Sequence, residues 1–198
     1  MGWWNLESMT GMESLKIVAV LGSGREEHEE VAWPLGVLLA ELGVHLLTGG
    51  GGGVMRSVSA GFASLDPPLR RGLVFGILPS RAAGGPPEPP PGYPNGFVEV
   101  AIRTHLPGRG EEGGTWYSRN SINIATADVV IVLPGGAGTA SEAELAREFL
   151  KPVIGLAGGG ACQGIAQAES LSEVEAFLGR VLKAVPSGSQ GSGQPPLS

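Results

Sequence analysis

The sequence predicts an α/β protein with three layers, in which helices cover both faces of a mainly parallel sheet of about six to seven strands. Two observations support this prediction. Short apolar runs alternate along the chain with longer segments whose apolar residues follow helical spacing. Three of the apolar runs end in or beside glycine-rich turns, at residues 22–24, 49–53 and 135–138. Such connections give a Rossmann-like fold, whose ligands bind beyond the carboxyl ends of the strands.

The first half of the chain alternates regularly between strand and helix. The expected elements, in chain order, are a strand, a helix, a strand, a helix and a strand at residues 16–21, 26–42, 44–48, 54–64 and 73–78. The first helix has one apolar face, acids in its first turns, where the helix dipole favours them, and Gly43 at its end. Proline and glycine dominate residues 80–96, which we expect to form an irregular loop.

The second half continues the alternation with weaker signals. It is expected to contain strands at residues 97–104, 129–133 and 152–156, and helices at residues 116–127, 139–150 and 171–185. Together the elements make a single domain over residues 15–185. Residues 1–14 and 186–198 are expected to be flexible termini, and serine, glycine, glutamine and proline dominate the second of them.

Composition limits the classes of partner. The 198 residues carry a formal net charge of −6, which argues against nucleic acid as a partner because nucleic-acid-binding proteins present a basic face. No apolar run reaches the roughly 18 residues that span a bilayer, so we expect a cytoplasmic protein without membrane contact. Cys162 is the only cysteine and the three histidines are dispersed, so we expect neither an internal disulfide nor a bound metal.

The stretch Pro-Gly-Gly-Ala-Gly-Thr-Ala-Ser-Glu at residues 134–142 carries the strongest functional signal. It lies between an apolar strand and a helix, and its glycines let the backbone turn tightly and approach a ligand. The helix presents free N–H groups and the positive end of its dipole to that turn, which favours a phosphate. Thr139 is expected to be the helix N-cap. Glu142, one turn into the helix, either complements the helix dipole or acts on the bound ligand.

Polar residues upstream of this motif point to the same class of ligand. Arg119 is a planar, permanently charged donor suited to a phosphate or a carboxylate. Asn120 and Asn123 carry amide groups that can hydrogen-bond a ring edge or a ribose. The first turn, Gly-Ser-Gly-Arg-Glu-Glu, lacks the third glycine of the dinucleotide fingerprint, and the chain has no Gly-Lys-Ser/Thr P-loop. The sequence therefore does not favour hydride transfer or ATP hydrolysis as the activity of this protein.

Together these residues resemble a superfamily that contains the Lonely Guy proteins, which are cytokinin-activating phosphoribohydrolases, and the molybdenum cofactor carrier proteins. The superfamily motif Pro-Gly-Gly-X-Gly-Thr-X-X-Glu matches residues 134–142, and Arg119 occupies the place of its upstream arginine. Residues 49–55 are similar to its second glycine turn. The resemblance covers residues 16–156 in element order. It implies a small phosphorylated ligand and a homodimer or larger homo-oligomer.

The resemblance leaves two functions open. The first is a binding or carrier protein for a nucleotide or a pterin phosphate, with the molybdenum cofactor as one candidate cargo and no other cofactor expected. The second is a hydrolase that cleaves the N-glycosidic bond of a nucleoside 5′-monophosphate, releasing a free base and ribose 5-phosphate. The hydrolases usually carry Arg-Lys and two acids where this chain has Arg119-Asn120 and Ser141-Glu142, which favours the carrier.

For the hydrolase, the resemblance implies that Arg119 orients the substrate and that Glu142 stabilises positive charge on the sugar or activates water. For either function, the predicted ligand-binding residues lie in the three glycine turns and beside Arg119. They are Gly22, Ser23, Gly24, Gly50, Gly51, Gly52, Met55, Asn120, Asn123, Pro134, Gly135, Gly136, Gly138 and Thr139.

Overall fold

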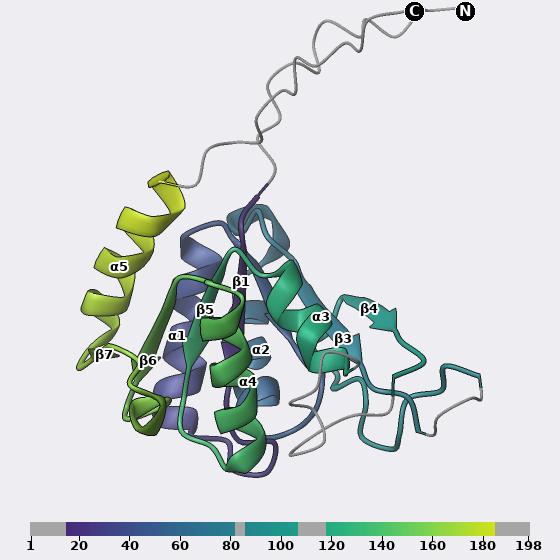
Figure 1. Ribbon diagram of the computed structural model, residues 1–198. Coiled ribbons are helices and arrows are strands. Elements are labelled where there is room, and N and C mark those ends of the chain that lie inside the picture. Colours follow the sequence, from purple (N-terminus) through teal and green to yellow (C-terminus); the bar gives the residue numbers. More distant parts are fainter. Residues whose placement is uncertain (1–14, 82–85, 107–117, 185–198) are drawn as a thin grey trace, which may run out of the picture.

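The computed structural model describes residues 15–81, 86–106 and 118–184 (Figure 1). Both segments expected to be flexible termini, residues 1–14 and 186–198, lie outside the described residues. The same holds for parts of the proline- and glycine-rich loop and for the start of the helix expected at residue 116.

A single sheet of seven parallel strands forms the middle layer. Its strand order is β4-β3-β2-β1-β5-β6-β7, and all six neighbouring pairs are parallel. The predicted fold class and strand number are confirmed. The strands are β1 Ile17–Leu21, β2 His45–Thr48, β3 Val74–Leu78, β4 Val100–Arg103, β5 Val129–Val132, β6 Val153–Leu156 and β7 Gln167–Ala168.

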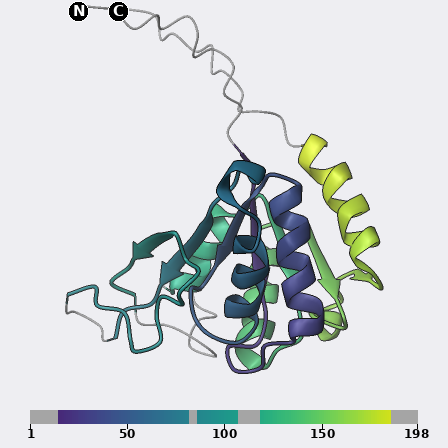
Figure 2. The same cartoon turned by 180° about the vertical axis from the view of Figure 1, so that it is seen from behind.

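Helices cover both faces of this sheet. They are α1 Glu29–Glu41, α2 Val54–Ala63, α3 Arg119–Thr126, α4 Ala137–Glu148 and α5 Leu171–Ala184, with short 3₁₀ turns at Pro67–Leu69 and Ala161–Gln163. In Figure 1, α3 and α4 lie in front of the sheet, and the reverse view in Figure 2 brings α1 and α2 to the front with α5 beside them. The three layers follow from this arrangement.

Alternating side chains of the central strands build two separate cores. On β1, Val18 and Val20 pack in the cluster shared with α1, α2 and α5, whereas Ala19 and Leu21 pack in the cluster shared with α3 and α4. All four residues of β5 are buried in the same alternating way. A strand covered on both faces needs apolar residues at every position, which explains why these strands appear in the sequence as continuous apolar runs.

The strand order reverses between β1 and β5, and this reversal positions the site. The two strands pair from Val18 with Val129 to Leu21 with Val132, so they end at the same level of the sheet. Each then runs into one of the glycine turns. A crevice outside the carboxyl ends of strands at such a reversal is where open α/β sheets bind ligands.

Several element boundaries differ from the sequence predictions. α1 begins at Glu29 rather than at residue 26, because His28 adopts a left-handed conformation with φ 42°. α4 begins at Ala137 with Gly136 as its N-cap, so the prediction that Thr139 caps this helix is wrong; Thr139 lies inside the first turn. The two-residue strand β7 was not predicted, since it is too short and too polar to show an apolar pattern.

Candidate functional site

An open pocket of about 970 Å³ lies at the carboxyl edge of the sheet, at the reversal between β1 and β5. Its size is at the upper end of the range for small-molecule sites. The lining comes from the end of β1, the turns after β1, β2 and β5, the starts of α2, α3 and α4, and the loop before β4. The lining residues are Val20, Leu21, Gly22, Ser23, Gly24, Arg25, Glu26, His28, Gly49, Met55, Tyr93, Arg119, Asn120, Pro134, Gly135, Gly136, Ala137, Gly138, Thr139 and Glu142.

The glycine turns are locked to one another by backbone hydrogen bonds. The Ser23 N–H donates to the carbonyl of Pro134 at 2.9 Å, and the Val54 N–H donates to the carbonyl of Ser23 at 2.9 Å. A Cβ at Gly22 would lie 2.7 Å from Cγ1 of Val54, and a Cβ at Gly135 would lie 2.9 Å from the Ser23 nitrogen. The turns approach so closely that only glycine fits at these two positions.

The N-terminus of α4 is open toward the pocket. Gly136, its N-cap, has no side chain to accept from the first N–H groups, and the first turn contains no acidic residue. Gly135, Gly136 and Ala137 are exposed. The N–H groups of the first turn have no partners within the helix, and the positive end of the dipole of this 12-residue helix adds to them. This end of the pocket is therefore suited to an anion.

Arg119, the first residue of α3, places a buried cation in the same pocket. Only 5% of the residue is exposed, and its Nε has no hydrogen-bond partner among the described residues. The guanidinium lies against the backbone of Gly49, where any Cβ would overlap it. The Ser118 hydroxyl fixes the start of this helix by accepting from the Ser121 N–H at 3.3 Å. A buried guanidinium with a free donor has the chemistry to bind an oxygen ligand.

Asn120 and Asn123 follow Arg119 on α3 and are 1% and 2% exposed. The Oδ1 atom of each has no hydrogen-bond partner among the described residues. Asn120 lines the pocket, whereas Asn123 does not. Asn120 therefore adds an unpaired acceptor to the pocket beside the Arg119 donor.

Glu142 lines the pocket from α4. The residue is partly buried, and its carboxyl is enclosed deeply enough that burial raises its pKa above the ordinary value, although the positive charge of Arg119 opposes this by lowering it. The two groups therefore act on one another electrostatically in the same pocket. A carboxyl whose pKa is raised in a cleft is typical of a functional group.

Part of the loop over residues 80–96 also enters the site. Tyr93 lines the pocket, and its ring lies against Gly51. Asn95 anchors this part of the loop, since its Nδ2 donates to the Gly51 carbonyl and its N–H donates to the Gly50 carbonyl, both at 2.8 Å. This loop shows no periodic pattern in the sequence, so the sequence alone does not mark Tyr93 as a site residue.

Twelve of the predicted site residues line this pocket and four do not. The four are Gly50, Gly51, Gly52 and Asn123. The first two bind the Asn95 loop through their carbonyls, and the Gly50 N–H donates to the Thr48 hydroxyl at 3.0 Å. Their neighbour Gly49 lines the pocket in their place.

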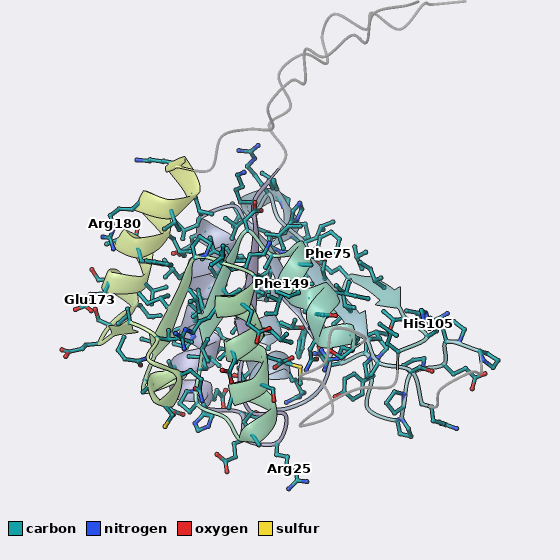
Figure 3. All side chains as sticks on the ribbon, in the orientation of Figure 1. Arg25, Phe75, His105, Phe149, Glu173 and Arg180 are labelled. Carbon is teal, nitrogen blue, oxygen red and sulfur yellow. The ribbon has the colours of Figure 1, made fainter. Side chains whose placement is uncertain are left out.

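Further lining residues sit at the mouth of the pocket. Arg25, Glu26 and His28 follow the first turn, and His28 Nε2 lies 3.2 Å from a Glu26 carboxylate oxygen. Figure 3 shows Arg25 at the edge of the molecule, and its side chain is exposed. Within the described residues, no three histidine, cysteine, aspartate or glutamate side chains are grouped to hold a metal ion, and no helix there is long and apolar enough to cross a membrane.

A profile of the SLOG cluster4 family matches residues 15–184. This chain belongs to the SLOG cluster4 family. An uncharacterized protein of Archaeoglobus fulgidus is 32% identical to this family member over 141 residues, which are 70% of this chain and 78% of the relative. The match to the family includes every residue that lines the pocket.

Solved structures resemble this SLOG cluster4 protein over most of its length. The molybdenum cofactor binding protein of Rippkaea orientalis has a TM-score of 0.68 and 30% identity, covering 87% of this chain and 99% of its own. The molybdenum cofactor carrier protein of Chlamydomonas reinhardtii has a TM-score of 0.62 and 25% identity, covering 86% and 99%. The family match and these structures confirm the predicted relationship to the superfamily of Lonely Guy and carrier proteins.

Proposed function

We propose that this protein binds a phosphorylated small molecule in the pocket, with the phosphate at the N-terminus of α4 and beside Arg119. The buried Arg119 guanidinium is the observation that carries this proposal. Burial of a charge is costly, and an anionic ligand would offset that cost while taking the free Nε–H. The helix dipole, the free N–H groups and the guanidinium all favour negative charge in this pocket.

The ligand class that fits this pocket is a nucleotide or a pterin phosphate, and the role is that of a binding or carrier protein. The pocket is large enough for a heterocycle in addition to a phosphate. Asn120 supplies an amide group for a polar ring edge. The similarity to a molybdenum cofactor binding protein supports the molybdenum cofactor as the carried ligand. Arg119 and the start of α4 would hold its phosphate.

Titration calorimetry with GMP tests the binding proposal. Guanine carries the same amino-oxo-pyrimidine edge as pterins, so GMP represents both ligand classes. We expect Arg119→Ala to weaken GMP binding by roughly tenfold to hundredfold, since a hydrogen bond to a charged group contributes about 1.5–3 kcal/mol. Arg180→Ala, on the exposed surface of α5, is the matched control and should bind as the unchanged protein does. Equal affinities of the two variants would refute the proposal.

A second function is favoured by Glu142. The direction of its pKa shift suits a carboxyl that gives or takes a proton during catalysis. With the phosphate of a nucleoside monophosphate at α4, Glu142 would stabilise positive charge at the sugar or activate water, which describes a phosphoribohydrolase. The hydrolases usually carry two acids where this chain has only Glu142, and a lysine where it has Asn120. Hydrolysis is therefore the second candidate function.

Release of ribose 5-phosphate from AMP and related monophosphates separates the two functions. Turnover that disappears in Glu142→Gln establishes the hydrolase and rejects a carrier without catalysis. If GMP binds while no monophosphate is cleaved, the hydrolase is rejected. Glu142→Gln keeps the shape of the side chain, so loss of binding in this variant would indicate a role in holding the ligand.

A further inference from the structure

Tyr93 forms a wall of the pocket that the phosphate site does not use. Its ring lies against Gly51 together with the methyl group of Met55, because a Cβ at Gly51 would lie 2.8 Å from Cε of Met55 and 2.8 Å from Cε1 of Tyr93. Met55 and Tyr93 both line the pocket. This part of the pocket therefore presents an aromatic ring and a polarizable methyl-thioether.

The segment that carries Tyr93 is fastened to the body of the protein. Asn95 is 8% exposed and donates to the carbonyls of Gly50 and Gly51, while its own Oδ1 accepts from the Phe97 N–H at 3.0 Å. Beyond it, the guanidinium of Arg56 lies 5.9 Å from the centre of the Phe97 ring. These contacts hold the Tyr93 ring in place before any ligand arrives, so the ring is preorganised for stacking.

Met55, Tyr93 and the start of α4 line one and the same pocket, and a chain of contacts connects them. Gly135, beside the start of α4, packs on Ser23; the next residue of that turn, Gly24, faces Met55, which would lie 3.7 Å from a Cβ there. Met55 then leads to Tyr93. A ligand with its phosphate at α4 would cross the first turn and bring its other end to Met55 and Tyr93.

We propose that Tyr93 is a specificity-determining residue that stacks on the planar heterocycle of the phosphorylated ligand. The pocket would thereby select nucleotide- or pterin-type phosphates over plain sugar phosphates, and Asn95 would act as a positioning residue for the ring. This inference rests on the proposed binding function and adds the part of the ligand that the Arg119 end does not recognise. Stacking of a base on an aromatic side chain tolerates different heterocycles, because each presents a π-face.

GMP and ribose 5-phosphate are the two probes that test this inference. Both contain a phosphate and a ribose, but only GMP contains a base. Calorimetry on the full chain should show that Tyr93→Leu weakens GMP binding by roughly tenfold to hundredfold and leaves ribose 5-phosphate binding unchanged. Tyr93→Phe keeps the ring and should bind GMP as the unchanged protein does. The Tyr93 hydroxyl has no hydrogen-bond partner among the described residues, so this variant removes no contact there.

Asn95→Ala provides an independent variant in case Tyr93→Leu does not fold. It removes the side-chain hydrogen bonds to the Gly51 carbonyl and from the Phe97 N–H. It should weaken GMP binding while leaving ribose 5-phosphate binding unchanged, a difference that general destabilisation would not produce. If Tyr93→Leu or Asn95→Ala weakens both probes equally, or weakens neither, the role of Tyr93 is rejected and the phosphate site stands. If the unchanged protein binds neither probe, the proposed function and this inference both fall.

Discussion

At the scale of single residues, Arg119 and Glu142 line the same pocket, and the carboxyl of Glu142 can take up a proton. Burial raises the pKa of this carboxyl, although the positive charge of Arg119 opposes the shift. The folded protein therefore holds this proton more tightly than the unfolded chain does. Ionisation of Glu142 at neutral pH accordingly opposes folding.

Glu142→Gln should stabilise the protein at neutral pH. Between the unfolded pKa and the raised folded pKa, stability falls as pH rises, and the ionised group keeps its full cost at higher pH. We expect the free energy of unfolding of the variant to be higher by about 0.5–2 kcal/mol at pH 7, which is the range common for single stabilising substitutions. The gain should shrink toward acid pH, where the carboxyl is protonated in both states. Thermal unfolding across this pH range measures the gain, and a variant less stable than the parent at pH 7 would contradict the expectation.

A substitution at Gly49 tests whether GMP binding depends on the position of the Arg119 guanidinium. Gly49→Ala would put a Cβ into the guanidinium, so the side chain must move away from the pocket. Because the guanidinium then leaves the position it holds in the structure, we expect a loss of GMP affinity, with about 1–3 kcal/mol of destabilisation from overpacking. Gly52→Ala is the matched control, because its Cβ would meet only the Gly24 carbonyl oxygen at 3.5 Å. Comparable affinities for the two alanine variants in calorimetry would count against this placement.

At the scale of elements, the edge strand β4 is fixed by an ion pair beside it. Three of its four residues are exposed. Glu99, just before the strand, accepts from Arg70 Nη1 and Nη2 at 2.9 and 2.8 Å and from the Val74 N–H of β3 at 2.9 Å. The Arg70 guanidinium also lies 5.3 Å from the centre of the Phe62 ring on α2. A bidentate pair of this geometry ties β4 to β3 and α2.

Glu99→Gln should therefore destabilise the protein in a pH-dependent way. The hydrogen bond from Arg70 holds the pKa of Glu99 below its ordinary value, helped by the Val74 N–H, although burial raises it. A lowered folded pKa gives stability that is present above the unfolded pKa and is lost as pH falls through the folded pKa. Thermal unfolding of the variant and its parent should differ at pH 7 and converge in strong acid. A difference that does not depend on pH would mean that packing, rather than charge, holds the strand.

At the scale of the whole molecule, the pocket is assembled from segments far apart in the sequence. The turns after β1 and β5, Gly49 after β2, and the starts of α3 and α4 all contribute to it. A ligand that contacts several of these segments binds only the folded chain. Binding must therefore raise the stability of the entire fold.

GMP should raise the melting temperature of the protein in proportion to the logarithm of its concentration. At a hundred times the dissociation constant, the gain in unfolding free energy is about 2.7 kcal/mol. Arg119→Ala should lose most of this shift at the same concentration, whereas Arg180→Ala should keep it. Scanning calorimetry gives the shifts. Equal shifts in all three proteins would place GMP somewhere other than the pocket.

The class of fold and the glycine turns that border the pocket could be predicted from the sequence alone. Continuous apolar runs such as Val129–Val132 are required in a strand covered on both faces, and they were visible without a structure. The glycines at 22 and 135 were visible as well, because close approach of backbones leaves no other residue type. Features of this kind depend on residues that are close together in the sequence.

Only the tertiary structure decided which residues meet. It brought Gly49 rather than Gly50 to Gly52 to the pocket, since the carbonyls of Gly50 and Gly51 bind Asn95, 44 residues away from Gly51. It also placed Tyr93 at the aromatic wall, although nothing near it in the sequence marks a site. Periodicity and turn chemistry are short-range signals, whereas contacts across a parallel sheet depend on the strand order, and that order forms only when the whole chain folds.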